Sequence, residues 1–219
     1  VSPPDAGALD FRDIDAINRQ TAYVLSIGNG AQSRILKTID GGATWETQFT
    51  NTEEDAFFDA MAFWDERRGL AFSDSASGRH HILRTVDGGR AWTRLPADAL
   101  PPALDNEGAF AASGTNVAVW GARHAWIGTG AAARARVLRT TDGGDTWAVS
   151  DTPLAAGPTS GIYSIAFRDA RHGVVVGGDY AKETEAVDNV AYSRDGGLTW
   201  TLAQGLTGFR SVVVHLPGG

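Results

Sequence analysis

The sequence predicts an all-β protein in which a unit of four short antiparallel strands recurs four times. An octet with a hydroxyl residue, an Asp two positions later, Gly-Gly and a closing Trp occurs at residues 38–45, 85–92, 140–147 and 193–200. Its tryptophans are separated by 47, 55 and 53 residues, which suits four short strands and their turns. The 27 glycines and seven tryptophans fit many hairpins with aromatic anchors, and no stretch shows convincing helical periodicity.

Each octet is predicted to close a tight hairpin. Asp-Gly favours turns that need a positive φ, and the Asp carboxylate can accept N–H groups of the turn while the Trp opens the returning strand. An octet has no second carboxylate at metal-ligand spacing, so we expect a structural role rather than metal binding or catalysis. The predicted structural residues are Asp40, Trp45, Asp87, Trp92, Asp142, Trp147, Asp195 and Trp200.

The octets allow the strands to be placed in order along the chain. Residues 1–10, with Pro3 and Pro4, are predicted as a connector. The first strands are expected at Phe11–Ile17, Phe57–Phe63, Phe110–Val119 and Ile162–Phe167, and the second strands at Ala22–Ile27, Gly69–Ser73, Ala125–Gly128 and Gly173–Gly177. The third strands are expected at Arg34–Lys37, His81–Thr85, Arg136–Thr140 and Val190–Ser193, and the fourth at Trp45–Phe49, Trp92–Leu95, Trp147–Ser150 and Trp200–Ala203. Phe209–Val214 repeats the first-strand pattern a fifth time.

The octet resembles the Asp-box, or bacterial neuraminidase, repeat, Ser/Thr-x-Asp-x-Gly-x-Thr-Trp. Three copies fit this pattern fully, and the second has Ala91 in place of Thr. In that family the box caps the hairpin between the third and fourth strands of a β-propeller blade, so the resemblance implies a propeller of four-stranded antiparallel blades. Sialidases, xyloglucan hydrolases, sorting receptors and photosystem assembly factors share the repeat, which therefore does not specify a function.

The phase of the repeats gives four complete blades plus one inner strand. Small residues recur across the first strands at Ala16, Ala62, Ser113, Ala166 and Val213, which suits the crowded axis of a propeller. An inner strand without its blade leaves an unpaired edge, and a closed four-bladed ring would leave Phe209–Val214 unexplained. A ring of six or seven such blades needs roughly 310–360 residues. We therefore predict that residues 1–219 form a single propeller domain that is incomplete at both ends.

Composition narrows the classes of function. With 42% hydrophobic and 21% charged residues, the chain suits a folded protein with a core, and its net charge of −7 argues against nucleic-acid binding. There is no apolar run of transmembrane length, no signal peptide at Val1 and no cysteine. No zinc-binding spacing, nucleophile elbow, phosphate loop or dinucleotide fingerprint occurs. We accordingly expect no metal or cofactor and assign no catalytic residue.

A binding site is expected on the face opposite the octets. Long irregular segments such as Pro96–Gly108 and Asp179–Asn189 fall there, and insertions gather on the binding face of repeat proteins. The residues aligned at the start of the inner strands, around the mouth of the channel, are Asp13, Asp59, Phe110, Tyr163 and Arg210. Three further candidates are expected nearby: Arg12, Glu107 and Asp179. These residues form either a ligand pocket or the solvated lining of the channel.

Glu107–Gly114 followed by Ala125–Gly130 resembles bacterial proteins of the photosystem II stability and assembly factor type. This resemblance implies an extracytoplasmic, periplasmic or secreted propeller that docks a partner protein, without implying photosynthesis. The alternative is a glycoside hydrolase of the sialidase or xyloglucanase type, acting on a glycan. Asp13 and Asp59 are candidate carboxylates for it, but the Phe/Tyr-Arg-Ile-Pro element of sialidases does not occur. The sequence favours a non-catalytic binding propeller over an enzyme.

Overall fold

The computed structural model describes residues 2–3 and 6–216. Four sheets of four antiparallel strands follow one another along the chain, as expected. Their strands are β1 Asp10–Ala16, β2 Ala22–Ile27, β3 Arg34–Thr38 and β4 Glu46–Thr50; β5 Phe58–Phe63, β6 Gly69–Ala76, β7 Arg79–Thr85 and β8 Thr93–Arg94; β9 Val117–Trp120, β10 His124–Gly128, β11 Arg136–Thr140 and β12 Ala148–Asp151; and β13 Ser160–Phe167, β14 Gly173–Asp179, β15 Val190–Ser193 and β16 Thr201–Leu202. Short 3-10 helices occur at η1 Gly30–Gln32, η2 Ala97–Ala99 and η3 Tyr180–Lys182. No helix in the described ranges is long and apolar enough to cross a membrane.

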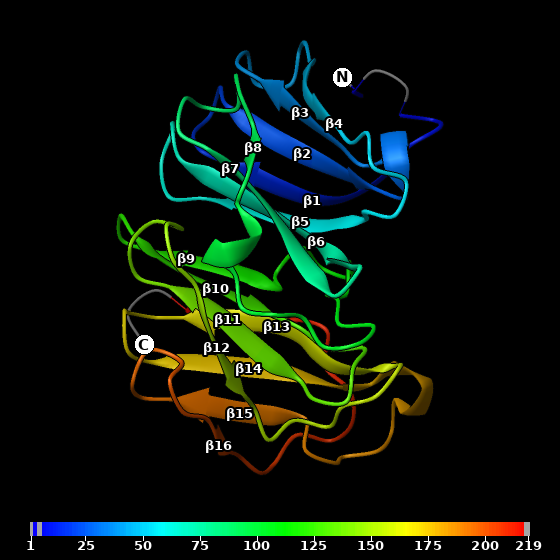
Figure 1. Ribbon diagram of the computed structural model, residues 1–219, viewed down its shortest axis with the longest axis vertical. Helices are drawn as coiled ribbons and strands as arrows, with labels where there is room; N and C mark the ends of the chain where they lie inside the picture. Colours follow the sequence, from blue (N-terminus) through cyan, green and yellow to red (C-terminus); the bar gives the residue numbers. More distant parts are fainter. Residues whose placement is uncertain (1, 4–5, 217–219) are drawn as a thin grey trace.

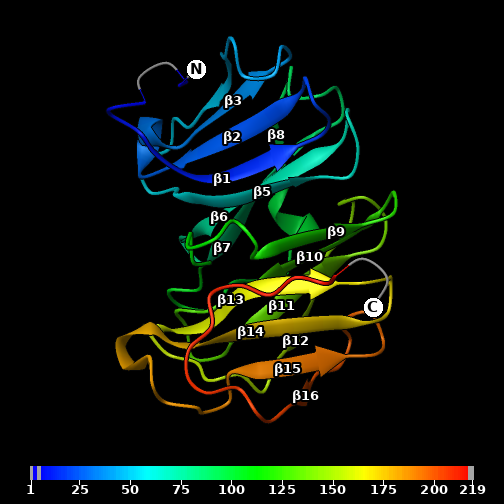
Figure 2. The same ribbon diagram turned by 180° about the vertical axis from the view of Figure 1, so that it is seen from behind.

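The four sheets are arranged like blades, and Figure 1 shows them one after another along the longest axis of the molecule. The first strand of each blade is innermost, and β1, β5, β9 and β13 contact one another in succession, as Figure 2 shows from behind. In the described part of the predicted connector, residues 1–10, no residue before Asp10 belongs to a strand. Pro4 lies outside the described residues. The all-β fold class and the four-stranded blade are thus confirmed.

The core lies between the blades rather than within them. Three separate hydrophobic clusters join the first blade to the second, the second to the third and the third to the fourth. Two of these interfaces have a stacked aromatic pair at equivalent positions: Tyr23 stacks on Phe63 with ring centroids 3.9 Å apart, and Trp126 stacks on Phe167 at 3.6 Å. The hydrophobic effect therefore fixes the neighbours of each blade, because no blade can cover both of its own faces.

The third inner strand is shorter than predicted. Residues 110–116 precede β9 as an irregular segment, and the strand covers only Val117–Trp120 instead of Phe110–Val119. Gly108 forms paired backbone hydrogen bonds with Gly130 of the β10–β11 loop, at 3.1 and 2.8 Å, which draws the connector away from the sheet. Ser113 consequently lies outside β9, and the prediction that it is an inner-strand residue is wrong.

Phe209–Val214 is also not a strand, although it occupies the place of a fifth inner strand. The N–H of Val213 donates to Ser164 Oγ at 3.0 Å, as the N–H of Met61 in β5 donates to Asp13 Oδ2 at 2.6 Å. The segment runs alongside β13, where Figure 2 shows it. Its bonds to Ser113 and Ser164 come from side chains rather than a backbone ladder, so it lacks strand pairing.

Every octet forms the predicted hairpin lock. In the third, the Thr140 hydroxyl donates to Asp142 Oδ1 at 2.7 Å and accepts the N–H of Gly144 at 3.0 Å. Asp142 also accepts the N–H and the hydroxyl of Thr146, at 3.0 and 2.6 Å. Gly143 and Gly144 have φ values of 83° and 90°, which residues with a Cβ rarely adopt.

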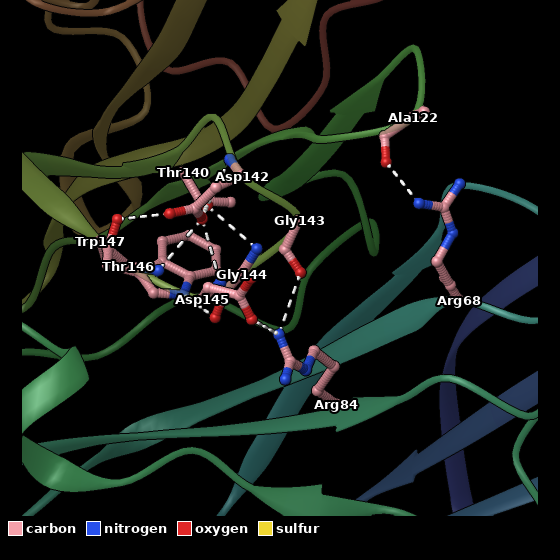
Figure 3. A network of polar contacts seen from close by, with 10 residues as sticks. All are labelled: Arg68, Arg84, Ala122, Thr140, Asp142, Gly143, Gly144, Asp145, Thr146 and Trp147. Atoms are coloured by element: carbon pink, nitrogen blue, oxygen red, sulfur yellow. Dashed lines mark hydrogen bonds and ion pairs between the residues drawn. The ribbon is translucent and has the colours of Figure 1, made fainter.

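The octets also connect neighbouring blades, a role that the sequence did not reveal. The carbonyl oxygen of the first octet glycine accepts a hydrogen bond from the preceding blade in each of the last three octets. Tyr23 Oη donates to Gly88 at 2.8 Å, Arg84 Nη1 to Gly143 at 3.4 Å and Trp126 Nε1 to Gly196 at 2.8 Å. Figure 3 shows Arg84 reaching the third octet, where it also contacts Asp145 at 2.5 Å. We call these three interactions the blade latches.

Candidate ligand-binding cleft

A cleft of about 430 Å³ opens where the inner strands begin, on the side opposite the octet turns. Four of the candidates from the sequence line it: Arg12, Asp59, Phe110 and Tyr163. The rest of its lining comprises Phe57, Asp74, Asn106, Gly108, Ala109, Ala111, Ala112, Ala131 and Tyr180. The inner strands β1, β5 and β13 therefore contribute to one concave surface, together with the connector between the second and third blades.

Glycines bring the connector close enough to form the wall of the cleft. Gly130 bridges Gly108 on one side and Gly161 on the other. A Cβ at Gly130 would lie 2.7 Å from the Gly161 Cα and 2.7 Å from the Phe110 ring, so no other residue fits there. Ala131, next in the chain, has a φ of 58°, a conformation that costs free energy in a residue with a side chain. The close approach of the backbone at Gly108, Gly130 and Gly161 thus fixes the position of Phe110.

Aromatic side chains form a connected group on one side of the cleft. Phe110 stacks on Tyr163 with ring centroids 4.0 Å apart and planes 6° apart. Tyr180 packs edge-on against both rings, at 6.5 and 6.3 Å. Tyr163 is 3% exposed and donates its hydroxyl to Thr159, whereas Tyr180 is 49% exposed. Burial raises the pKa of Tyr163, so its hydroxyl stays protonated. Tyr163 is therefore held in place by burial and its hydrogen bond, whereas the ring of Tyr180 is accessible to a ligand.

Two carboxyl groups, those of Asp59 and Asp74, also line the cleft. Asp59 in the bulge of β5 is 1% exposed, and Asp74 of β6 accepts the N–H of Ala109 at 2.9 Å. Burial, and then the neighbouring Asp74, raise the pKa of Asp59 well above its usual range. Burial raises the pKa of Asp74 to about 6, while hydrogen bonds from Ala109 and Asp59 oppose the rise. Neighbouring carboxyl groups oppose each other's ionisation, so Asp59 keeps its proton at pH values where an isolated Asp is ionised.

Arg12 is the cation of the cleft and is already engaged. It occupies the bulge of β1, and its guanidinium forms two hydrogen bonds with the Asp10 carboxylate, at 2.8 and 2.9 Å. Asp59 and Tyr163 occupy the corresponding bulges of β5 and β13. In β1, β5 and β13 the bulge therefore turns the bulged side chain toward the cleft, which is why these three residues converge.

The other four candidates support the surroundings of the cleft instead of lining it. Glu107 is buried in an ion pair with Arg136 and accepts the hydroxyl of Thr129 at 2.7 Å. Asp13 holds the N–H of Met61, and Asp179 accepts the N–H of Ala181 at 2.9 Å at the start of η3. Arg210 folds onto its own segment, donating to the carbonyl of Phe209 at 2.7 Å. Asp179 thereby positions the helix that carries Tyr180.

Two important residues of the cleft, Asp74 and Tyr180, were not predicted. Asp74 lies near the end of β6, beyond the expected strand Gly69–Ser73, and its apposition to Asp59 depends on strand register. Tyr180 follows directly after Asp179, and an aromatic residue in a long loop was the available signal. Within the described residues no group of three or more His, Asp or Glu side chains is placed to hold a metal ion.

The comparisons with known proteins agree with this description. The BNR/Asp-box repeat family matches residues 191–202, which contain the fourth octet. No curated protein sequence matches the chain. Among solved structures, a YCF48 bound to a D1 peptide is similar with a TM-score of 0.57, at 19% identity, over 92% of this chain and 56% of that one. YCF48 from Cyanidioschyzon merolae gives 0.51, at 16% identity, over 84% and 50%.

A mutant of Trypanosoma rangeli sialidase that displays trans-sialidase activity is similar with a TM-score of 0.52, at 15% identity, over 89% of this chain and 37% of that one. The chain thus spans about half the length of the two YCF48 structures and less of the sialidase. At these identities the likeness establishes the fold. The chain is an all-β, propeller-type protein that carries the BNR/Asp-box repeat.

Proposed function

We propose that this chain is a non-catalytic binding propeller that docks an extended segment of a partner protein in the cleft. The observation that carries the proposal is the cleft itself, where a rigid aromatic group and a buried carboxyl pair converge from separate blades. Concave sites that combine apolar walls with a few oriented polar groups are typical of ligand binding. The similarity to a YCF48 bound to a peptide supports this choice of ligand class. We infer an extracytoplasmic location from the resemblance of the sequence to assembly factors.

The carboxyl pair argues against the alternative of a glycoside hydrolase. Retaining and inverting enzymes hold their two carboxyl groups about 5–5.5 Å or about 6.5–9.5 Å apart, leaving room for the sugar or a water. Asp59 is 1% exposed, which leaves its carboxyl group little access to a sugar or an attacking water. Arg12 is the one arginine among the residues that line the cleft, whereas a sialidase needs three. A glycan as a bound ligand, without hydrolysis, remains the second class of partner.

Site-specific photo-cross-linking tests the docking site. A benzophenone side chain is placed at Tyr180 in the cleft or, as the matched control, at Ile39 on an octet; these positions are 49% and 70% exposed. Each protein is exposed to the envelope fraction of its native cell, and cross-linked peptides are sequenced. We expect the probe at position 180 to label one segment of one partner, with competition by unlabelled wild-type protein.

The variant Phe110→Ala should compete poorly, because the ring that stacks on Tyr163 is lost. Labelling of the same partner from position 39 but not from position 180 would place docking on the octet face and overturn the proposal.

A further inference from the structure

We propose that the cleft recognises a cationic side chain, Lys or Arg, in the docked segment, and that the Asp59–Asp74 pair is its counter-charge. This inference rests on the proposed function and names the chemistry of the same site. It commits the partner to an extended protein segment with one basic residue that enters the cleft.

The first step is that the carboxyl pair has no resident cation. Asp59 Oδ2 is buried and receives no hydrogen bond from a donor group in the described part of the chain. The charge of the neighbouring Asp74 contributes, after burial, to the raised pKa of Asp59. Buried carboxyl groups are ordinarily paired with a base or a metal ion, because desolvating them is costly. The buried Asp59, with the partly buried Asp74 beside it, therefore has an unmet preference for positive charge.

The second step is that the protein's own nearby cation is held elsewhere. Both hydrogen bonds of Arg12 to a carboxylate go to Asp10, outside the cleft lining. The other titratable residues that line the cleft, Tyr163 and Tyr180, bear no positive charge. A cation that pairs with Asp59 and Asp74 would thus come from a ligand.

The third step concerns the walls. Lys and Arg carry long apolar stems, which bury well against aromatic and alanine side chains while the charged head reaches a carboxylate. The lining supplies Phe57, Phe110 and four alanines for such a stem, and the half-exposed Tyr180 ring is available for a cation–π contact. A carboxylate-bearing ligand would meet like charge at the same place and is excluded by repulsion.

Proton linkage supplies an independent signature. Burial raises the pKa of Asp74 to about 6 and that of Asp59 well above its usual range, so the free pair retains protons in mild acid. A bound guanidinium or ammonium favours the ionised acids, so binding releases protons and affinity rises with pH. Between pH 5 and pH 8 we expect the affinity for a basic peptide to increase about tenfold.

Selection from a random peptide display library tests the inference on the intact chain. We expect the wild-type protein to enrich peptides with Arg or Lys at one position, and binding to weaken about tenfold or more in Asp74→Asn. This variant should fold, because an Asn amide can still accept the N–H of Ala109 and donate to Asp59. Asp98→Asn removes an exposed carboxylate in η2, outside the cleft, and is the matched control with unchanged binding.

The outcomes separate this inference from the proposed function. Selected peptides that lack a basic residue, but lose binding in Phe110→Ala, would leave a peptide cleft and refute the cationic ligand. Peptides whose Arg or Lys can be replaced by citrulline or acetyl-lysine without loss would refute it as well. An absence of peptides whose binding depends on Phe110 or Asp74 would overturn both proposals.

Discussion

At the second octet, Ala91 stands where the other three octets have threonine, and the Asp87 carboxylate has one hydrogen bond fewer as a result. The hydroxyl groups of Thr44, Thr146 and Thr199 each donate to the octet carboxylate at 2.6 Å. The Thr44 hydroxyl is the main cause that lowers the pKa of Asp40 to about 2. The pKa of Asp87 is also lowered, chiefly by the N–H of Ala91. The chain therefore contains its own comparison between a complete and an incomplete lock.

Ala91→Thr should complete the second lock. We expect the thermal midpoint to rise by about 1–3 °C, because the new hydroxyl adds a charge-assisted hydrogen bond to Asp87 without displacing a buried group. Calorimetry measures the midpoint, and NMR titration should show a further decrease in the pKa of Asp87. Thr146→Ala is the mirror variant and should lower the midpoint. A fall in the midpoint of Ala91→Thr would show that the turn, rather than the missing hydroxyl, limits this octet.

At the scale of elements, the octets could be predicted from sequence because all their contacts are local. Thr140, Asp142 and Thr146 meet within one turn, so their spacing alone predicts their hydrogen bonds. Asp59 and Asp74 meet through the pairing of β5 with β6, and a bulge in that pair decides which side chain reaches the cleft. Phe110 was identified as a candidate, but the strand predicted for it does not form, because Gly108 of the connector pairs with Gly130 of the β10–β11 loop. Non-local backbone crossings leave little trace in a single sequence.

The blade latches give a prediction at the same scale. In Trp126→Phe the ring can still stack on Phe167, but the hydrogen bond from Nε1 to the carbonyl of Gly196 is lost. We expect the free energy of unfolding to fall by about 1–3 kcal/mol, from the lost hydrogen bond and the smaller ring.

Trp120 is 41% exposed, so Trp120→Phe is a matched control that should change stability by less than about 0.5 kcal/mol. Urea unfolding of the two variants and the wild type measures both effects. Equal unfolding midpoints for the two variants would show that the latch adds nothing to the interface.

For the whole molecule, half-buried acids should make the fold more stable in mild acid than at alkaline pH. Burial raises the pKa of Asp13 from 3.8 to about 7, and its neighbour Asp15 adds to the rise while hydrogen bonds oppose it. Burial likewise raises the pKa of Asp74 to about 6. A folded state that keeps these protons is stabilised below the unfolded pKa, and this stability is lost as pH rises through the folded pKa.

We therefore expect the free energy of unfolding to decrease between pH 4 and pH 8, by on the order of 3 kcal/mol for Asp13. Urea unfolding at several pH values measures the decrease. Asp13→Asn should flatten this dependence, since an amide has no proton to lose. Below pH 4 the octet carboxylates act in the opposite direction, because hydrogen bonds from Thr44 and its neighbours lower the pKa of Asp40 to about 2. Stability that increases steadily from pH 4 to pH 8 would contradict the burial of these acids.

The blade latches all point the same way along the chain: a side chain of one blade donates to the octet of the next. During synthesis from the N-terminus, each blade consequently emerges from the ribosome before the acceptor for its own donor exists. Trp126 is 1% exposed in the folded protein, and its acceptor, the carbonyl of Gly196, is synthesised 70 residues later. Each nascent blade should thus become resistant to protease only after the octet of the following blade has been synthesised. Protection should appear in steps spaced by the length of a repeat.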